Sequence, residues 1–233
     1  MKLKIALFVA LMLAFNVGVF AQKAKSNTEP LQVGAIAPDF TLASNGKEDV
    51  TLSEINKPTV LVFYRGYWWP YCVRQLADLR NLLEEDEKVA LFAISIDTPD
   101  KSNIMTERVA KDGKGEIKFP ILSDPMHKTI DDYGLLDTRY IGRGIEGVPQ
   151  TAIYILGEDR KIVWANVSED YVNRPTVADL RTEINKLKKM SGKEMMDKKE
   201  KMMDKKEQME KPASKKMMEK EKMEKKDPQD KSD

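Results

Sequence analysis

The sequence predicts an α/β domain in which helices flank a mixed central sheet. Two observations predict this fold class. Short apolar runs of strand length alternate with segments whose apolar residues recur at helical spacing. The last two runs flank a turn around Gly157-Glu158-Asp159, which indicates a hairpin. Alternating strands and helices favour parallel pairing, and the final hairpin adds antiparallel pairing, so the sheet is expected to be mixed.

Two apolar runs and the segment between them form the first predicted unit. Thr59 to Tyr64 and Val89 to Ile96 each have the length and composition of a buried strand. Between them, four apolar residues fall at helical spacing: Cys72, Leu76, Leu79 and Leu83. We therefore predict a helix from Pro70 to about Glu85 that packs on the sheet, with the proline in its first turn.

The second half of the domain continues the alternation. The predicted elements are a helix at Pro99 to Ala110, a strand at Phe119 to Leu122, a brief helix at Met126 to Tyr133, hairpin strands at Thr151 to Leu156 and Lys161 to Val167, and a closing helix at Thr176 to Lys188.

Residues 1–21 have the pattern of a secretory signal peptide. Lysines at positions 2 and 4 precede an apolar run from Ile5 to Phe15, and small residues Val19 and Ala21 precede Gln22. The alternative is a membrane anchor, but the run is shorter than the roughly 20 residues that span a bilayer. We expect an exported protein, periplasmic or secreted, with no stable membrane insertion after cleavage and with residues 22–30 as a linker.

The net charge of +1 is the sum of unlike parts. Residues 186–233 contain 17 Lys and 12 acidic residues, without an aromatic residue, and the preceding body is acidic. We predict a single domain at residues 31–187 and a Met/Lys/Glu-rich low-complexity tail at residues 188–233. Met195, Met202 and Met209 recur every seven residues, which leaves a soft-metal site, an oxidant sink or a solvated tail as alternatives. Because lysines alternate with acids and no aromatics can stack on bases, we expect no nucleic-acid binding.

The chain has one cysteine and one histidine. These counts exclude an internal disulfide framework and the usual multi-cysteine or multi-histidine metal centres, so we predict no metal and no cofactor. Cys72 follows a turn at Gly66 and lies in the first turn of the predicted helix. A helix N-terminus stabilises negative charge, which makes Cys72 a candidate nucleophile. The alternative is a small buried residue on the leucine stripe of that helix.

The segment from Tyr64 to Cys72, with the sequence YRGYWWPYC, resembles the Tyr-Arg-Gly-x-Trp-Cys-Pro-x-Cys region of a known family. These are the peroxiredoxin-like proteins of the alkyl hydroperoxide reductase and thiol-specific antioxidant (redoxin) superfamily. Other stretches are also similar to that family: Gly34 to Leu42, Ala93 to Asp97 followed by Leu122 to Pro125, and Glu169 to Pro175. The resemblance covers Leu31 to Leu187 and implies a thioredoxin-like fold.

The resemblance also implies a chemistry. Cys72 aligns with the peroxidatic cysteine of true peroxiredoxins, whereas Trp69 replaces the first cysteine of the Cys-x-x-Cys pair. True peroxiredoxins carry Thr at the position of Trp69 and Pro at that of Arg65. No second cysteine can resolve a mixed disulfide, so a dithiol cycle is excluded. What remains is an antioxidant thiol peroxidase in which Cys72 reduces peroxide and an external thiol restores it.

Three further site residues follow from the resemblance. An arginine usually completes the peroxidatic site, and we predict Arg143 in that place. Val148-Pro149 resembles the cis-proline loop of thioredoxins, which contacts extended peptides, so Trp69, Val148 and Pro149 are candidate substrate-binding residues. The alternative to an enzyme is a catalytically degenerate binding protein that acts through its aromatic surface or its Met-rich tail.

Overall fold

The structure is a computed structural model that describes residues 28–46, 48–83, 88–168, 170, 172–189 and 200–203. The predicted signal peptide, most of the linker and almost all of the tail lie outside the described residues. The domain between them is built on a seven-stranded sheet with the order β2-β1-β5-β4-β3-β6-β7. The strands are β1 (Thr41–Ser44), β2 (Val50–Thr51), β3 (Thr59–Phe63), β4 (Ala90–Ser95), β5 (Ile121–Ser123), β6 (Thr151–Leu156) and β7 (Ile162–Ser168).

The sheet is mixed, which confirms the predicted fold class. Strand β4 is parallel to both β3 and β5, whereas β3–β6, β6–β7, β1–β5 and β1–β2 are antiparallel. The parallel strands are connected by helices, and the antiparallel pair β6–β7 forms the predicted hairpin.

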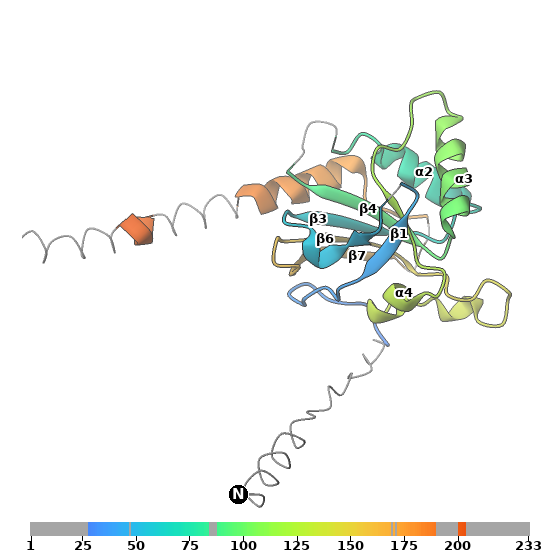
Figure 1. Ribbon diagram of the computed structural model, residues 1–233, viewed down its shortest axis with the longest axis horizontal. Coiled ribbons are helices and arrows are strands. Elements are labelled where there is room, and N and C mark those ends of the chain that lie inside the picture. Colours follow the sequence, from blue (N-terminus) through green and yellow to red (C-terminus); the bar gives the residue numbers. More distant parts are fainter. Residues whose placement is uncertain are drawn as a thin grey trace, which may run out of the picture.

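Helices cover both faces of this sheet. They are α2 (Pro70–Leu79), α3 (Pro99–Ala110) and α4 (Lys128–Asp132), with a helix at residues 177–189 and 3-10 turns η1 (Leu52–Glu54) and η2 (Thr138–Tyr140). In Figure 1, α2, α3 and the helix at residues 177–189 lie on one side of the sheet, and α4 lies on the other. No helix of the described residues is long and apolar enough to cross a membrane.

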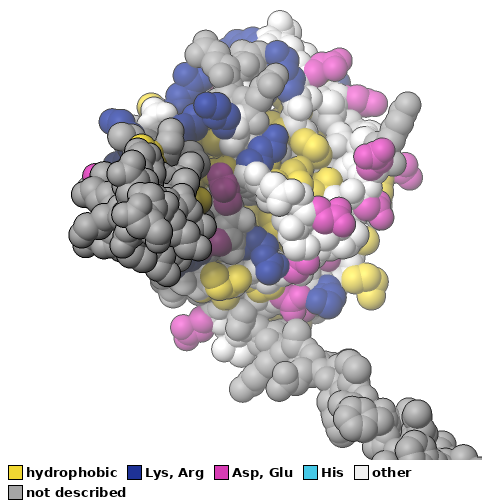
Figure 2. Space-filling model, turned by 60° about the vertical axis from the view of Figure 1, so that its left-hand side comes forward, with side chains coloured by type: hydrophobic (Ala, Val, Ile, Leu, Met, Phe, Trp, Pro, Cys, Tyr) yellow, Lys and Arg dark blue, Asp and Glu magenta, His cyan; other side chains and the backbone are white. Residues whose placement is uncertain are grey.

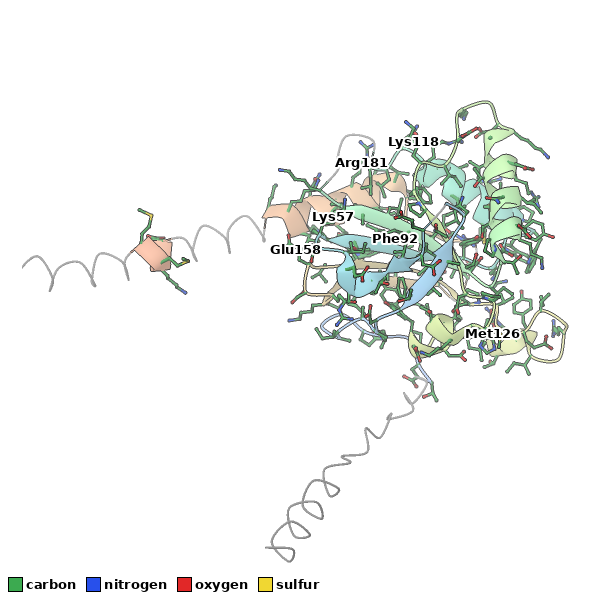
Figure 3. The ribbon with its side chains drawn as sticks, in the orientation of Figure 1. Lys57, Phe92, Lys118, Met126, Glu158 and Arg181 are labelled. Atoms are coloured by element: carbon green, nitrogen blue, oxygen red, sulfur yellow. The ribbon has the colours of Figure 1, made fainter. Side chains whose placement is uncertain are left out.

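Strand alternation divides the interior into two cores. Val60 and Val62 of β3, and Tyr64 just after it, face α2, α3 and the helix at residues 177–189, while Leu61 and Phe63 face the side of α4. The first face also holds Cys72 and carries the site described below, so we call it the thiol face. Phe92 of β4, labelled in Figure 3, belongs to the opposite core.

The end of α2 differs from the prediction. The helix ends at Leu79 rather than near Glu85, and residues 80–83 form turns in which Leu82 is buried. Arg80 fixes this end, because its guanidinium donates to the carbonyl of Gly115 and forms an ion pair with Asp112. Arg181 of the helix at residues 177–189 donates to the Asn81 carbonyl at 3.1 Å, which ties that helix to the same turn (Figure 3).

The surface of the domain carries both signs of charge. On the face shown in Figure 2, Lys and Arg side chains gather mainly at the upper left, and Asp and Glu side chains lie mainly on the right. Small groups of hydrophobic side chains lie between them. This face is therefore mixed rather than uniformly basic or acidic.

Candidate active site

A strand, a turn and a helix place Cys72 on the thiol face. The chain leaves β3 at Phe63, turns at Gly66 and enters α2, for which Trp69 is the N-cap residue. A Cβ atom at Gly66 would lie 2.6 Å from the indole Nε1 of Trp68, so the turn needs glycine. The Cys72 amide donates to the Trp69 carbonyl at 2.9 Å, which puts the cysteine in the first helical turn, as predicted.

Asp97, just after β4, holds this turn in place. Its Oδ2 accepts a hydrogen bond from the Tyr67 amide at 2.6 Å and another from the Tyr64 hydroxyl at 3.4 Å. Burial raises the pKa of Asp97, and these hydrogen bonds offset part of that rise. The carboxyl end of β4 therefore fixes the loop that carries the cysteine.

Arg174 lies against the thiol. Its two terminal nitrogens are 3.8 and 3.7 Å from the Cys72 Sγ, and the same guanidinium donates to the Gln75 Oε1. Gln75 lies one helical turn beyond Cys72 on α2, so one helix supplies both the sulfur and the acceptor that orients the arginine. A guanidinium beside sulfur stabilises negative charge on it, and so does the start of α2.

The arginine at the thiol is not the predicted one. Arg143 lies exposed in the turns at residues 141–147, and its amide donates to the Tyr140 carbonyl. Among the described residues, the arginine whose guanidinium contacts the Cys72 Sγ is Arg174 rather than Arg143. Arg174 belongs to the stretch Glu169 to Pro175, which is similar to the family in sequence. That similarity was the one sequence feature that could have pointed to this arginine. Its partner Gln75 and the buried Thr151, discussed below, carried no such signal.

The segment at Val148-Pro149 also differs from the prediction. No peptide bond among the described residues is cis, so the Val148–Pro149 bond is trans and the cis-proline hypothesis is wrong. Both residues are buried. The Val148 carbonyl accepts from the Asp137 amide, and Leu136 forms an isolated antiparallel bridge with Pro149. This segment is therefore buried and paired with residues 135–137 of the same domain.

The Trp69 side chain packs against the domain and is not fully exposed to solvent. Its ring is partly buried against the core of the thiol face, and the Arg65 guanidinium lies 5.0 Å from its centroid. Arg65 is itself 1% exposed, pairs with Asp137 at 3.2 Å and donates to the Tyr140 hydroxyl at 2.6 Å. Burial by itself would raise the pKa of Asp137, but hydrogen bonds and charge from Arg139, together with the charge of Arg65, lower it.

A groove lies beside Arg174 and Gln75, the two residues next to the thiol. It has a volume of about 410 Å³ and runs between α2 and the segment at residues 172–177. Its lining residues are Tyr71, Arg74, Gln75, Asp78, Leu79, Val172, Arg174, Pro175, Thr176 and Val177. Cys72 is absent from this lining and is 0% exposed, so Arg174 and Gln75 separate the sulfur from the open groove. In this conformation the site is closed.

The described residues hold no group of three or more His, Cys, Asp and Glu side chains that could bind a metal ion. The site itself holds a cysteine beside a guanidinium in the first turn of α2. Such a sulfur can act as a nucleophile once a small substrate reaches it.

Comparisons with known proteins agree with this geometry. Residues 33–165 match the model of the AhpC/TSA family. The chain is 31% identical over 137 residues to peroxiredoxin Bcp of Escherichia coli strain K12, covering 57% of this chain and 83% of that protein.

Solved structures share the fold. A yeast mitochondrial 1-Cys peroxiredoxin superposes with a TM-score of 0.61 at 15% identity, covering 70% of this chain and 78% of that one. Peroxidoxin BcpB of Mycobacterium tuberculosis gives 0.54 at 21% identity, covering 68% and 97%. These likenesses confirm a thioredoxin-fold peroxiredoxin-like architecture.

Proposed function

The chain belongs to the AhpC/TSA family, and on that premise we propose that it is a thiol peroxidase that reduces peroxides with Cys72, its single cysteine. The observation that carries the assignment to this residue is the contact between the Arg174 guanidinium and the Cys72 Sγ in the first turn of α2. A buried sulfur that serves only as packing needs no cation beside it.

The proposed reaction is a two-electron oxidation of sulfur. The Cys72 thiolate attacks one peroxide oxygen, the S–O bond forms as the O–O bond breaks, and the product is a sulfenic acid. The other oxygen leaves as hydroxide or alkoxide and takes a proton from solvent. Arg174 stabilises negative charge on the sulfur before attack and on the leaving oxygen during it.

Access to the sulfur requires a local opening. Cys72 is 0% exposed, and the Gln75–Arg174 pair lies between it and the groove. Arg174 belongs to residues 173–176, which form neither helix nor strand. We therefore place the entry route along the groove, with a shift of this segment admitting the peroxide.

Regeneration of the thiol needs an external reductant. The chain has no second cysteine that could form an internal disulfide with the sulfenic acid. The yeast 1-Cys peroxiredoxin that shares the fold is described as resolved through glutathione and thioredoxin systems. By analogy we propose a low-molecular-weight or protein thiol as the reductant of this chain.

A binding protein without catalysis is the weaker candidate. To bind a partner through its aromatic surface, such a protein would need aromatic side chains that are exposed to solvent. Instead Tyr67, Trp68 and Trp69 are each partly buried, and Arg65 lies over the ring of Trp69. Tyr71 is the exception, since it is 38% exposed and lines the groove, so three of the four aromatic residues at this turn are partly buried within the domain.

The decisive test follows peroxide consumption by the purified protein with an excess of a small thiol. We expect the wild-type protein to consume peroxide catalytically and Cys72→Ser to show only the background rate of the thiol itself. Equal rates for the two proteins would refute the proposal. Thermal unfolding of both proteins controls for the loss of structure in the variant.

We also propose that the protein is exported. The support is the sequence of residues 1–21, which lies outside the described residues, with its basic start, apolar run and small residues at positions 19 and 21. Expression in a Gram-negative host, followed by fractionation and N-terminal sequencing, tests it. We expect periplasmic protein that begins at Gln22, and cytoplasmic protein that retains residue 1 would contradict export.

A further inference from the structure

Thr151, the first residue of β6, carries a buried hydroxyl that has no role in the reaction proposed above. Its side chain is 4% exposed, and its Oγ1 has no hydrogen-bond partner among the described residues. Buried polar groups in folded proteins are nearly always paired, so an orphan of this kind needs an explanation.

The sheet register places this residue on the thiol face. Strand β6 pairs antiparallel with β3, and Ala152 lies opposite Phe63. One step further along both strands, Thr151 therefore comes opposite Tyr64, just where the chain leaves β3 for the turn before α2. Alternation along β6 puts Thr151 on the same side as Ile153 and Ile155, which belong to the core that contains Cys72.

A crevice joins this hydroxyl to the groups that surround the sulfur. Its lining includes Thr151 together with Gln75 and Arg174, and those last two residues also line the groove. In this conformation the crevice is too narrow to hold a water molecule. The same movement of the Arg174 segment that admits a peroxide would widen it. Thr151 and Arg174 therefore line one crevice, and the Arg174 guanidinium contacts the Cys72 Sγ.

We propose that Thr151 is a catalytic residue that binds the peroxide, a role that rests on the proposed peroxidase function. As the Cys72 sulfur attacks one oxygen and the O–O bond breaks, the Thr151 hydroxyl donates to the leaving oxygen, which Arg174 also contacts. The leaving oxide takes its proton from solvent and the sulfur is oxidised by two electrons.

The proposal predicts that removing the hydroxyl slows the reaction with peroxide but not reactions of the same sulfur that need no such contact. Two rates are measured on each protein: oxidation of Cys72 by hydrogen peroxide, and alkylation of Cys72 by iodoacetamide. Both require access to the sulfur, but only the first breaks an O–O bond. Thr151→Val keeps the shape and removes the hydroxyl, and Thr151→Ser retains it.

We expect oxidation of Thr151→Val to fall roughly tenfold or more, with alkylation unchanged and Thr151→Ser close to wild type. Thr59→Val is the matched control, because it removes a buried hydroxyl at the other end of β3, where Thr59 donates to the Lys57 carbonyl. It should leave both rates unchanged. Thr151→Ala serves the same purpose if valine prevents folding.

Several results would overturn the proposal. These are an unchanged oxidation rate in Thr151→Val, a parallel fall in oxidation and alkylation, or a Ser variant as slow as the Val variant. The proposed function is tested separately by the wild-type protein. If its thiol does not react with peroxide, the peroxidase function fails as well. If it reacts and Thr151→Val reacts equally fast, only the role of Thr151 fails.

Discussion

The guanidinium of Arg65 lies 5.0 Å from the centroid of the Trp69 ring, so the two positions at which this chain departs from the peroxiredoxin motif are in contact. The stack continues to Tyr140, whose ring centroid is 5.1 Å from the same guanidinium, and the charge is balanced by Asp137. The two replacements therefore form one structural unit. The Trp69 ring lies against one side of a guanidinium whose charge Asp137 balances, as in a cation–π pair.

Coupling between these two residues can be measured by a double-mutant cycle. We expect Arg65→Met and Trp69→Leu each to destabilise the domain, and their combination to cost less than the sum by about 2 kcal/mol, as for a desolvated cation–π pair. Urea unfolding of the four proteins gives the coupling energy. Additive effects would show that the two replacements are independent.

Arg174 and Arg143 make a matched pair of tests for the arginine at the thiol. Arg174→Gln removes the cation 3.7 Å from the sulfur, and we expect oxidation of Cys72 to slow by on the order of 10². Arg143→Gln removes an exposed arginine of the loop and should leave the rate unchanged. The reverse pattern would restore Arg143 to the site. Competition kinetics with a peroxide-reactive probe gives both rates.

The Arg80–Asp112 pair predicts a pH dependence of stability. The hydrogen bonds and charge of Arg80 lower the pKa of Asp112 to about 2, below its ordinary value near 3.9. Since the folded pKa is depressed, the contribution to stability is complete above about pH 4 and is lost as the pH falls toward 2. Asp112→Asn should lower the melting temperature at neutral pH, and its difference from wild type should shrink across that window. A difference independent of pH would contradict this account.

Gly66 is expected to tolerate no side chain. A Cβ there would meet the Trp68 indole at 2.6 Å, so Gly66→Ala should displace that ring, disturb the turn before α2 and cost about 1–3 kcal/mol. Gly113→Ala is the control, since Gly113 also has a positive φ of 72° but open space around its Cα. It should cost about 1 kcal/mol and leave Cys72 oxidation unchanged. An equal loss of stability and reactivity in both variants would refute the role of the contact.

Local patterns predicted most of the secondary structure because alternation and helical spacing are properties of short segments. The helix at Pro99–Ala110 and the strand at Thr151–Leu156 have the predicted bounds. The predicted helix at α2 was too long. Leu83 continues the helical spacing, but the chain turns at Arg80. The short strands β1 and β2 carry too few residues to show a period.

The site was predicted less completely than the fold. The position of Cys72 follows from its place at the start of a helix, which is local information. Its arginine comes from 102 residues further along the chain, and the Arg65–Asp137 ion pair joins residues 72 apart. Such pairings depend on how the elements pack, which spacing within a segment does not encode. Thr151 is marked only by a buried hydroxyl that has no hydrogen-bond partner among the described residues, a property that exists in the folded protein alone.

The most direct test of the account is the rate at which hydrogen peroxide oxidises Cys72 in the purified protein, followed by intact mass with a sulfenic-acid trap. Because the chain has one cysteine, a single adduct on one peptide reports the reaction without ambiguity. We predict that Cys72 gains one oxygen and is trapped as a sulfenate, faster than free cysteine under the same conditions. A thiol that forms no adduct, or reacts no faster than free cysteine, would contradict the assignment of Cys72 as the peroxide-reducing nucleophile.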